Sequence, residues 1–317
     1  MTPLRKNHLL TLGLLALLSG PLAHAVEPAN AYIVVDHYSG KIFAQKNADE
    51  KLPVASLTKI ATACVVVDWA QATGTNLAQL MAVPPQATAL GGPNPLKLQS
   101  GDQLTLRDGL YSALMASDNV VAESLAYHVG NDLMRRRGKG GDPIGEFVRE
   151  MNALAGKLGM LKTKFSNAHG LDYGLRKPPY STAKDLCRLT KYAMDKSDFR
   201  FYVSQKSRKI SVTRGGQRRS FGLKNTNELV GKSRIDGVKT GQTSSSGPCL
   251  IVSATRPNRV FKRADGSSQV QPLRLNAVVL GAQDRFRSGK QLIDWGWRES
   301  DGWNAAGRPM SDRNGSL

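Results

Sequence analysis

The 317-residue chain is 40% hydrophobic, and its 44 Lys and Arg against 25 Asp and Glu give a formal net charge of +19. This composition excludes a disordered or fibrous protein, and the length suits one large domain or two closely packed subdomains. Such a charge predicts attraction to an anionic wall polymer or membrane surface, and no metal or organic cofactor is expected.

The N-terminus has the pattern of a secretory signal peptide. Arg5 and Lys6 precede an apolar run at 9–18, and the small-residue site Ala23-His24-Ala25 follows. The run is shorter than the roughly 20 residues that cross a bilayer, so an uncleaved anchor is the weaker alternative. We therefore predict a signal peptide at 1–25 and an exported protein of the periplasm or another extracytoplasmic wall space.

Alternating apolar runs and helical spacing predict the elements of the remaining chain. A β-hairpin is expected over 31–44, and a helix is expected to begin close to Ser56, with Leu57, Ile60, Ala61 and Cys64 on its apolar positions. Further helices are predicted at 106–115, 119–128, 144–158 and 288–297, and strands at 209–213, 219–223, 238–243, 250–254 and 275–280.

This order predicts an α/β (α+β) fold, with an antiparallel sheet flanked by helices and an all-helical subdomain at about 84–185. The catalytic domain is expected at 26–298, followed by a polar, disordered tail at 299–317. The dense basic run at 135–139 is interpreted as a solvated loop, and because it lacks interleaved aromatic residues, nucleic acid is not an expected partner. Cys64, Cys187 and Cys249 are predicted to be buried free thiols, with one disulfide plus a free thiol as the alternative.

Three short motifs carry candidate chemistry, and the first pairs Ser56 with Lys59. Helical spacing puts their hydroxyl and amine on one face about one turn apart, where a neutral amine can take the hydroxyl proton. Lysine ordinarily titrates at about 10.4, so its pKa must be lowered. Partial burial and a second cation, with Lys239 as the candidate, would both act in that direction.

The second motif, Ser117-Asp118-Asn119, stands between two predicted helices. Ser117 can relay a proton toward a leaving amine, and the Asn119 amide can hold a peptide backbone. The structural alternative is ordinary N-capping of the following helix by Ser117 or Asp118.

The third motif, Lys239-Thr240-Gly241, lies on a predicted strand before a Ser-rich turn. An edge strand can pair with an extended peptide, Lys239 and Thr240 can bind a terminal carboxylate, and Gly241 lets two backbones approach. The backbone N-H groups of Ser56 and Gln242 are the expected oxyanion-binding pair. A solvated lysine on an edge strand is the alternative.

Together these motifs form the signature shared by class A β-lactamases and penicillin-binding proteins. The chain resembles the low-molecular-weight penicillin-binding proteins, the D-alanyl-D-alanine carboxypeptidase family, over nearly all of its mature sequence. The matching segments are PVASLTK at 53–59, NAHGLD at 167–172, YSTAKD at 180–185, NTN at 225–227, DGVKTG at 236–241 and VVLG at 278–281.

The resemblance implies a β-lactamase/transpeptidase-like fold and a serine peptidase that removes the terminal D-Ala of a peptidoglycan stem peptide, with β-lactam antibiotics as inhibitors. It implies that Ser56 is the acylated nucleophile and Lys59 the proton acceptor. Ser117 and Asn119 would form the second catalytic element, and Lys239 would bind substrate. His169 is interpreted as structural. The chain ends before the β-rich domain and anchor of the larger members, and Gln242 stands where the family often has His.

Three alternatives are open. A class A β-lactamase would carry a Glu-x-x-Leu-Asn segment, and the matching stretch at 165–171 reads FSNAHGL instead. An endopeptidase that cuts cross-links shares the chemistry, although the carboxypeptidase is preferred. A non-catalytic penicillin-binding sensor would keep the pocket without turnover, which the intact Ser56, Lys59 and Lys239 disfavour.

Overall fold

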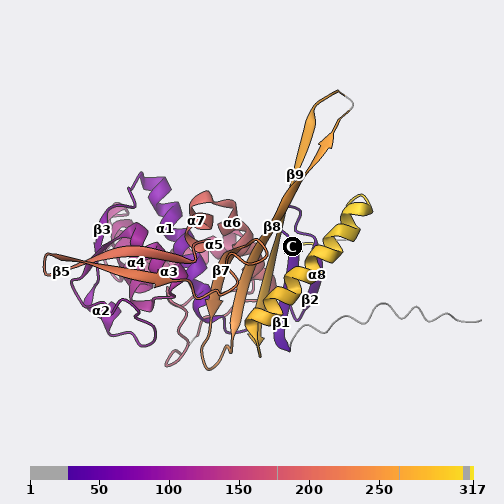
Figure 1. Cartoon of the computed structure of the whole chain (residues 1–317). Helices are drawn as coiled ribbons and strands as arrows, with labels where there is room; N and C mark the ends of the chain where they lie inside the picture. The colour runs from indigo at the N-terminus through magenta and orange to yellow at the C-terminus, as the bar shows by residue number, and fades with distance from the viewer. Residues whose placement is uncertain (1–27, 177, 264, 310–314) are drawn as a thin grey trace, which may run out of the picture.

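A computed structural model describes residues 28–176, 178–263, 265–309 and 315–317 (Figure 1). The predicted signal peptide lies outside the described residues. No described helix is long and apolar enough to cross a membrane.

The larger sheet is antiparallel and has the strand order β2-β1-β9-β8-β7. Its strands are β1 (Ala29–Asp36), β2 (Ile42–Lys46), β7 (Ile235–Gly241), β8 (Cys249–Lys262) and β9 (Ser268–Ala282). The first half of β8 and the second half of β9 are buried, because helices cover both faces of this part of the sheet. Beyond the sheet, β8 and β9 continue as a projecting hairpin (Figure 1).

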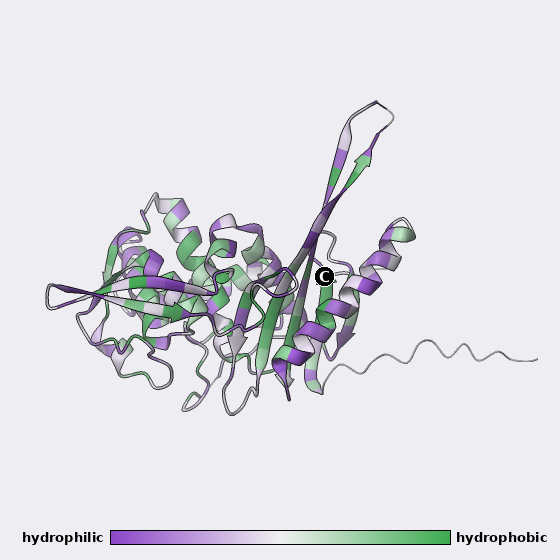
Figure 2. Cartoon of the chain, viewed as in Figure 1, coloured by the Kyte–Doolittle hydropathy of each residue, from purple (hydrophilic) through white to green (hydrophobic). Residues whose placement is uncertain are grey.

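Helix α8 (Arg285–Ala305) covers one face of this sheet and buries Leu292, Ile293 and Trp297, while hydrophilic and hydrophobic residues alternate along its ribbon (Figure 2). Asp284 caps its N-terminus by accepting from the backbone N-H groups of Phe286 and Arg287. Gly289 and Gly296 allow a close approach, since a Cβ at either position would come within 2.7 Å of a side chain on the sheet.

The other face is covered by a helical subdomain around α1 (Lys59–Thr73). Its further helices are α2 (Pro85–Thr88), α3 (Leu106–Met115), α4 (Asn119–Arg136), α5 (Pro143–Lys157), α6 (Ala183–Asp195) and α7 (Ser197–Val203). Helix α1 contacts α3, α4, α5 and α6, which explains why it is apolar on nearly every side.

The predicted fold class is confirmed, with two corrections to its parts. The subdomain is not purely helical, because β3 (Leu80–Ala82), β4 (Gln103–Thr105), β5 (Ser207–Arg214) and β6 (Gln217–Lys224) form a second sheet beside its helices.

The second correction concerns the boundaries of the predicted parts. The helices of the subdomain continue past residue 185 through α6 and α7, and α8 runs without a break to Ala305, so the predicted tail does not begin at residue 299. Leu317 also donates a backbone hydrogen bond to the Gly40 carbonyl oxygen at 3.1 Å.

Candidate active site

Ser56 lies in a 3-10 turn, η1 (Ala55–Thr58), which leads directly into α1. Two glycines from distant segments pack on the backbone of this turn. A Cβ on Gly170 would come within 1.9 Å of the Ala55 carbonyl oxygen, and one on Gly241 would lie 3.2 Å from the Ser56 backbone nitrogen. A side chain at Gly170 would clash with this turn, and one at Gly241 would fit only after a small shift of the backbone, so both glycines favour the approach that brings the end of β7 beside the serine.

Lys59 is the first residue of α1, and its side chain is fully buried. Its Nζ donates to Ser56 Oγ at 2.9 Å, to Asn119 Oδ1 at 2.7 Å and to the His169 carbonyl oxygen at 2.8 Å. Burial lowers the pKa of Lys59 to about 7, against a smaller opposing effect of Asp118. A neutral amine is therefore accessible near neutral pH, and it can accept the Ser56 proton.

Each residue of the Ser117-Asp118-Asn119 connection makes a different contact. Asp118 caps α4 by accepting from the backbone N-H of Val121, so the capping alternative holds for this residue. Ser117 has a left-handed backbone, with φ at +61°, and its hydroxyl accepts from Lys239 Nζ at 2.9 Å. Asn119 is buried beside Lys59, so the connection links both lysines of the site.

Lys239 and Thr240 lie near the end of β7, an edge strand. Burial lowers the pKa of Lys239 well below its usual value, and the charges of Lys59 and Arg285 act in the same direction. Thr240 shares a hydroxyl hydrogen bond of 2.7 Å with Thr226. Lys239, expected as the second cation that lowers the pKa of Lys59, is not among the causes found there: burial lowers the pKa of Lys59, and it is the charge of Lys59 that acts on Lys239.

Gln242 differs from its predicted place, because β7 ends at Gly241 and the exposed Gln242 follows it. Arg285, the first residue of α8, donates to the Gly241 carbonyl oxygen at 3.1 Å and to Gln242 Oε1 at 3.3 Å. This half-buried guanidinium places an additional positive charge at the end of the edge strand.

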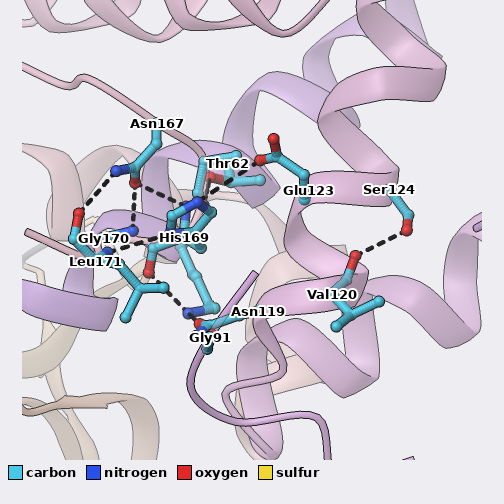
Figure 3. Close-up of polar contacts among 12 residues, drawn as sticks. Thr62, Gly91, Asn119, Val120, Glu123, Ser124, Asn167, His169, Gly170 and Leu171 are labelled. Atoms are coloured by element: carbon cyan, nitrogen blue, oxygen red, sulfur yellow. Dashed lines mark hydrogen bonds and ion pairs between the residues drawn. The ribbon is translucent and has the colours of Figure 1, made fainter. Parts of the chain in front are cut away.

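The segment 167–171 lies beside Asn119 and Glu123 of α4 (Figure 3). Asn167 Oδ1 accepts from the backbone N-H groups of His169 and Gly170, and His169 Nδ1 accepts from Leu171 N-H. His169 Nε2 then carries the ring hydrogen of the neutral form, and it lies 3.8 Å from Glu123 Oε2. The His169 ring is structural in this arrangement, while its backbone carbonyl meets Lys59.

The structure brings the predicted residues of all three motifs together at one place. Sequence reasoning missed the His169 carbonyl, Thr226 and Arg285. The first two lie in segments that match the family, but a contact made by a backbone carbonyl cannot be predicted from a side-chain motif. Arg285 lies outside every motif and every matching segment. Within the described residues, no group of three His, Cys, Asp or Glu side chains is placed to hold a metal ion. The three cysteines are buried and unpaired, as predicted.

Ser56 is hydrogen-bonded to a buried lysine amine, and the pair lies between an antiparallel sheet and a helical subdomain. This arrangement defines a serine acyl-transfer site of the β-lactamase and penicillin-binding protein class. Within that class, the chain belongs to the D-alanyl-D-alanine carboxypeptidase family, peptidase S11, which it matches over residues 22–263.

Individual relatives agree with this assignment. The chain is 32% identical to the D-alanyl-D-alanine carboxypeptidase DacC of Escherichia coli over 280 residues, covering 85% of this chain and 61% of that protein. It therefore spans about three fifths of the length of DacC. A D-alanyl-D-alanine endopeptidase of Pseudomonas aeruginosa is 30% identical, with 74% of this chain and 69% of that protein covered.

Solved structures show the same fold. The Streptomyces K15 DD-transpeptidase superposes with a TM-score of 0.71 at 27% identity, covering 86% of this chain and all of that one. Penicillin-binding protein D2 of Listeria monocytogenes, solved in its ampicillin-bound form, gives 0.65 at 28% identity, covering 85% and 97%.

Proposed function

We propose that this chain is an exported serine D-alanyl-D-alanine carboxypeptidase that removes the terminal D-Ala of peptidoglycan stem peptides. The observation that carries the proposal is the 2.9 Å contact between Lys59 Nζ and Ser56 Oγ in a buried environment. Family membership supports the choice of substrate.

The reaction begins when neutral Lys59 takes the Ser56 proton and Ser56 Oγ attacks the carbonyl carbon of the penultimate D-Ala. The peptide C-N bond breaks, and the amine of the leaving D-Ala takes a proton through Ser117, whose hydroxyl contacts Lys239. Water then attacks the Ser56 ester, which releases the shortened peptide and returns the proton to the serine. Each step balances without a cofactor.

The substrate is held by groups at the end of β7. Lys239, Thr240 and Arg285 bind the terminal carboxylate, because an amine, a hydroxyl and a guanidinium lie together at the end of this strand. Asn119 orients the peptide backbone. The backbone N-H groups of Ser56 and Gln242 bind the developing oxyanion, which the packing of Gly241 on the Ser56 turn supports.

The direct test is release of free D-Ala from a soluble pentapeptide. The wild-type protein should release one D-Ala per peptide, and Ser56→Ala should release none while keeping its unfolding midpoint. A folded wild-type protein that leaves the pentapeptide intact would refute the proposal.

Cleavage of cross-links is the second candidate, favoured by the similarity to the Pseudomonas aeruginosa endopeptidase. The two activities share Ser56 and differ in the group beyond the scissile bond. A purified cross-linked dimer separates them. Faster cleavage of the dimer than of the pentapeptide, compared by kcat/KM, would replace carboxypeptidase by endopeptidase.

β-Lactams are the proposed inhibitors, because they acylate the same serine. The stretch that holds the deacylating Glu in class A β-lactamases here presents the His169 carbonyl to Lys59. We therefore expect slow release of the drug rather than turnover. Rapid consumption of penicillin would favour a β-lactamase. Cells that carry Ser56→Ala and show an unchanged cell wall would favour a non-catalytic sensor.

The basic surface is proposed to hold the enzyme near an anionic wall polymer or membrane surface. A formal net charge of +19 supports this placement, since long-range attraction scales with charge. Raising the salt concentration should release the protein from purified wall and from anionic vesicles, and binding that ignores salt would contradict an electrostatic origin.

A further inference from the structure

A cavity of about 550 Å³ opens on the helical subdomain, away from Ser56. It lies at the far ends of the two helices that carry the catalytic residues. Trp69 follows Lys59 by ten residues along α1, which corresponds to about 15 Å. Arg135 follows Asn119 by sixteen residues along α4, or about 24 Å. The cavity is therefore separate from the acyl-transfer site but is built on the same two helices.

Two arginines at the cavity share a single carboxylate. Asp132 is buried, accepts from Trp69 Nε1 at 2.8 Å, and also accepts from Arg135 and Arg136. One positive charge is left over, and each guanidinium keeps further N-H donors. The Arg135 side chain is 77% exposed and that of Arg136 is 49% exposed, so these donors can meet a ligand. Asp132 thus holds both guanidinium groups in position before a ligand binds.

The basic run at 135–139 is thus more than the solvated loop that its sequence suggested. Its first two residues end α4 and line the cavity. Arg137 turns away from them and pairs with Glu146 and Glu150.

The remaining walls combine aromatic rings with amides. The rings of Trp69 and His128 pack edge to face with centroids 6.0 Å apart, and Tyr127 lies beside them. Burial lowers the pKa of His128, so its ring is a neutral donor and acceptor at pH 7. Gln79, whose amide is 3.4 Å from His128 Nε2, and Asn131 are exposed at the cavity.

We propose that this cavity binds an acidic N-acetylated amino sugar of the cell-wall glycan. The arginines take its carboxylate, the amides take its acetamido and hydroxyl groups, and the rings pack against its apolar face. Because so much of the lining is polar, a lipid chain does not fit. The inference rests on the proposed function for its biological purpose. A muramic acid that carries a stem peptide has its carboxyl in the amide to that peptide, so the cavity takes a peptide-free sugar of the strand and thereby keeps a neighbouring stem peptide within reach of Ser56.

The first experiment measures binding alone, independently of catalysis. N-acetylmuramic acid is titrated into the wild-type protein by calorimetry and by NMR of the tryptophan indole N-H signals. We expect saturable binding that shifts one indole signal. N-acetylglucosamine, which lacks the carboxylate, and glucuronic acid, which lacks the acetamido group, should each bind at least about tenfold more weakly. No binding, or equal binding of all three sugars, would overturn the proposal.

Two variants locate the site. Arg135→Ala/Arg136→Ala should weaken binding at least about tenfold, and Arg149→Ala is the matched control, an exposed arginine on α5 outside the cavity. Should the double variant misfold, Gln79→Ala/Asn131→Ala leaves the Asp132 ion pairs intact and should weaken binding about fivefold. Unchanged binding in a folded variant at this cavity would refute the site.

The last comparison connects the cavity to catalysis. In the cavity variants, kcat/KM should fall about fivefold or more for pentapeptide on glycan strands that also carry peptide-free N-acetylmuramic acid, and stay unchanged for free pentapeptide. An equal fall for both substrates would contradict a glycan site. If the wild-type protein releases no D-Ala from either substrate, the proposed function is refuted. The sugar titration then decides separately whether the cavity binds the sugar.

Discussion

In the proposed mechanism Lys59 accepts the Ser56 proton, so its protonation state predicts a pH profile. Burial lowers its pKa from 10.5 to about 7, and only the neutral amine accepts the Ser56 proton. The rate of acylation by penicillin should therefore rise about tenfold per pH unit below pH 7 and level off above it. Lys59→Arg, which cannot deprotonate, should lose at least about 100-fold at every pH. A wild-type rate still climbing at pH 9 would contradict a lowered pKa.

Glu123 is a second buried group with a measurable effect. Its Oε2 atom has no hydrogen-bond partner among the described residues, and burial, with help from Asp142, raises its pKa from 4.5 to about 7. Between those pH values the folded chain keeps a proton that the unfolded chain has lost. This residue therefore lowers the free energy of unfolding as pH rises, by about 3 kcal/mol in total.

Glu123→Gln should remove this dependence. The stability of the variant relative to wild type should increase by about 3 kcal/mol between pH 4.5 and pH 8, measured by urea unfolding. Glu50→Gln, at an exposed position, is the control and should show no such change. Parallel curves for wild type and Glu123→Gln would mean that Glu123 is not held protonated.

At the scale of elements, Gly170 fixes the segment 167–171 against the Ser56 turn. Its φ is +87°, and a Cβ would come within 1.9 Å of the Ala55 carbonyl oxygen. Gly170→Ala should lower the free energy of unfolding by about 3 kcal/mol, from backbone strain and a clash, and should slow acylation. Gly174→Ala is matched in φ, at +68°, but has open space, so it should cost only about 1 kcal/mol. Equal losses of unfolding free energy in both variants would mean that the contact of Gly170 with Ala55 contributes nothing beyond the backbone strain.

Local patterns predicted some elements well and others poorly. Helix α3 matches its predicted bounds, because its apolar face is periodic and Thr105 caps it. Helix α6 was missed, although Thr182 caps it and Leu186, Leu189 and Ala193 recur at helical spacing. Strands β3 and β4 have three residues each, too few for an alternation to be recognised. The end of α8 was misjudged because its last turns are polar.

At the scale of the whole molecule, the site exists because three distant segments converge. Ser56 and Lys59 come from the start of α1, Ser117 and Asn119 from the α3–α4 connection, and Lys239 from β7. Their order and local contexts were predictable from the sequence. Their contacts were not, because the register of β7 on β8 and the close approach at Gly241 are long-range properties.

The central claim is that Ser56 forms a covalent ester, and intact mass spectrometry after brief exposure to penicillin tests it most directly. The wild-type protein should gain the mass of one penicillin and keep it for minutes or longer, while folded Ser56→Ala should gain none. An adduct that persists in Ser56→Ala, or a wild-type protein that remains unmodified, would contradict the account.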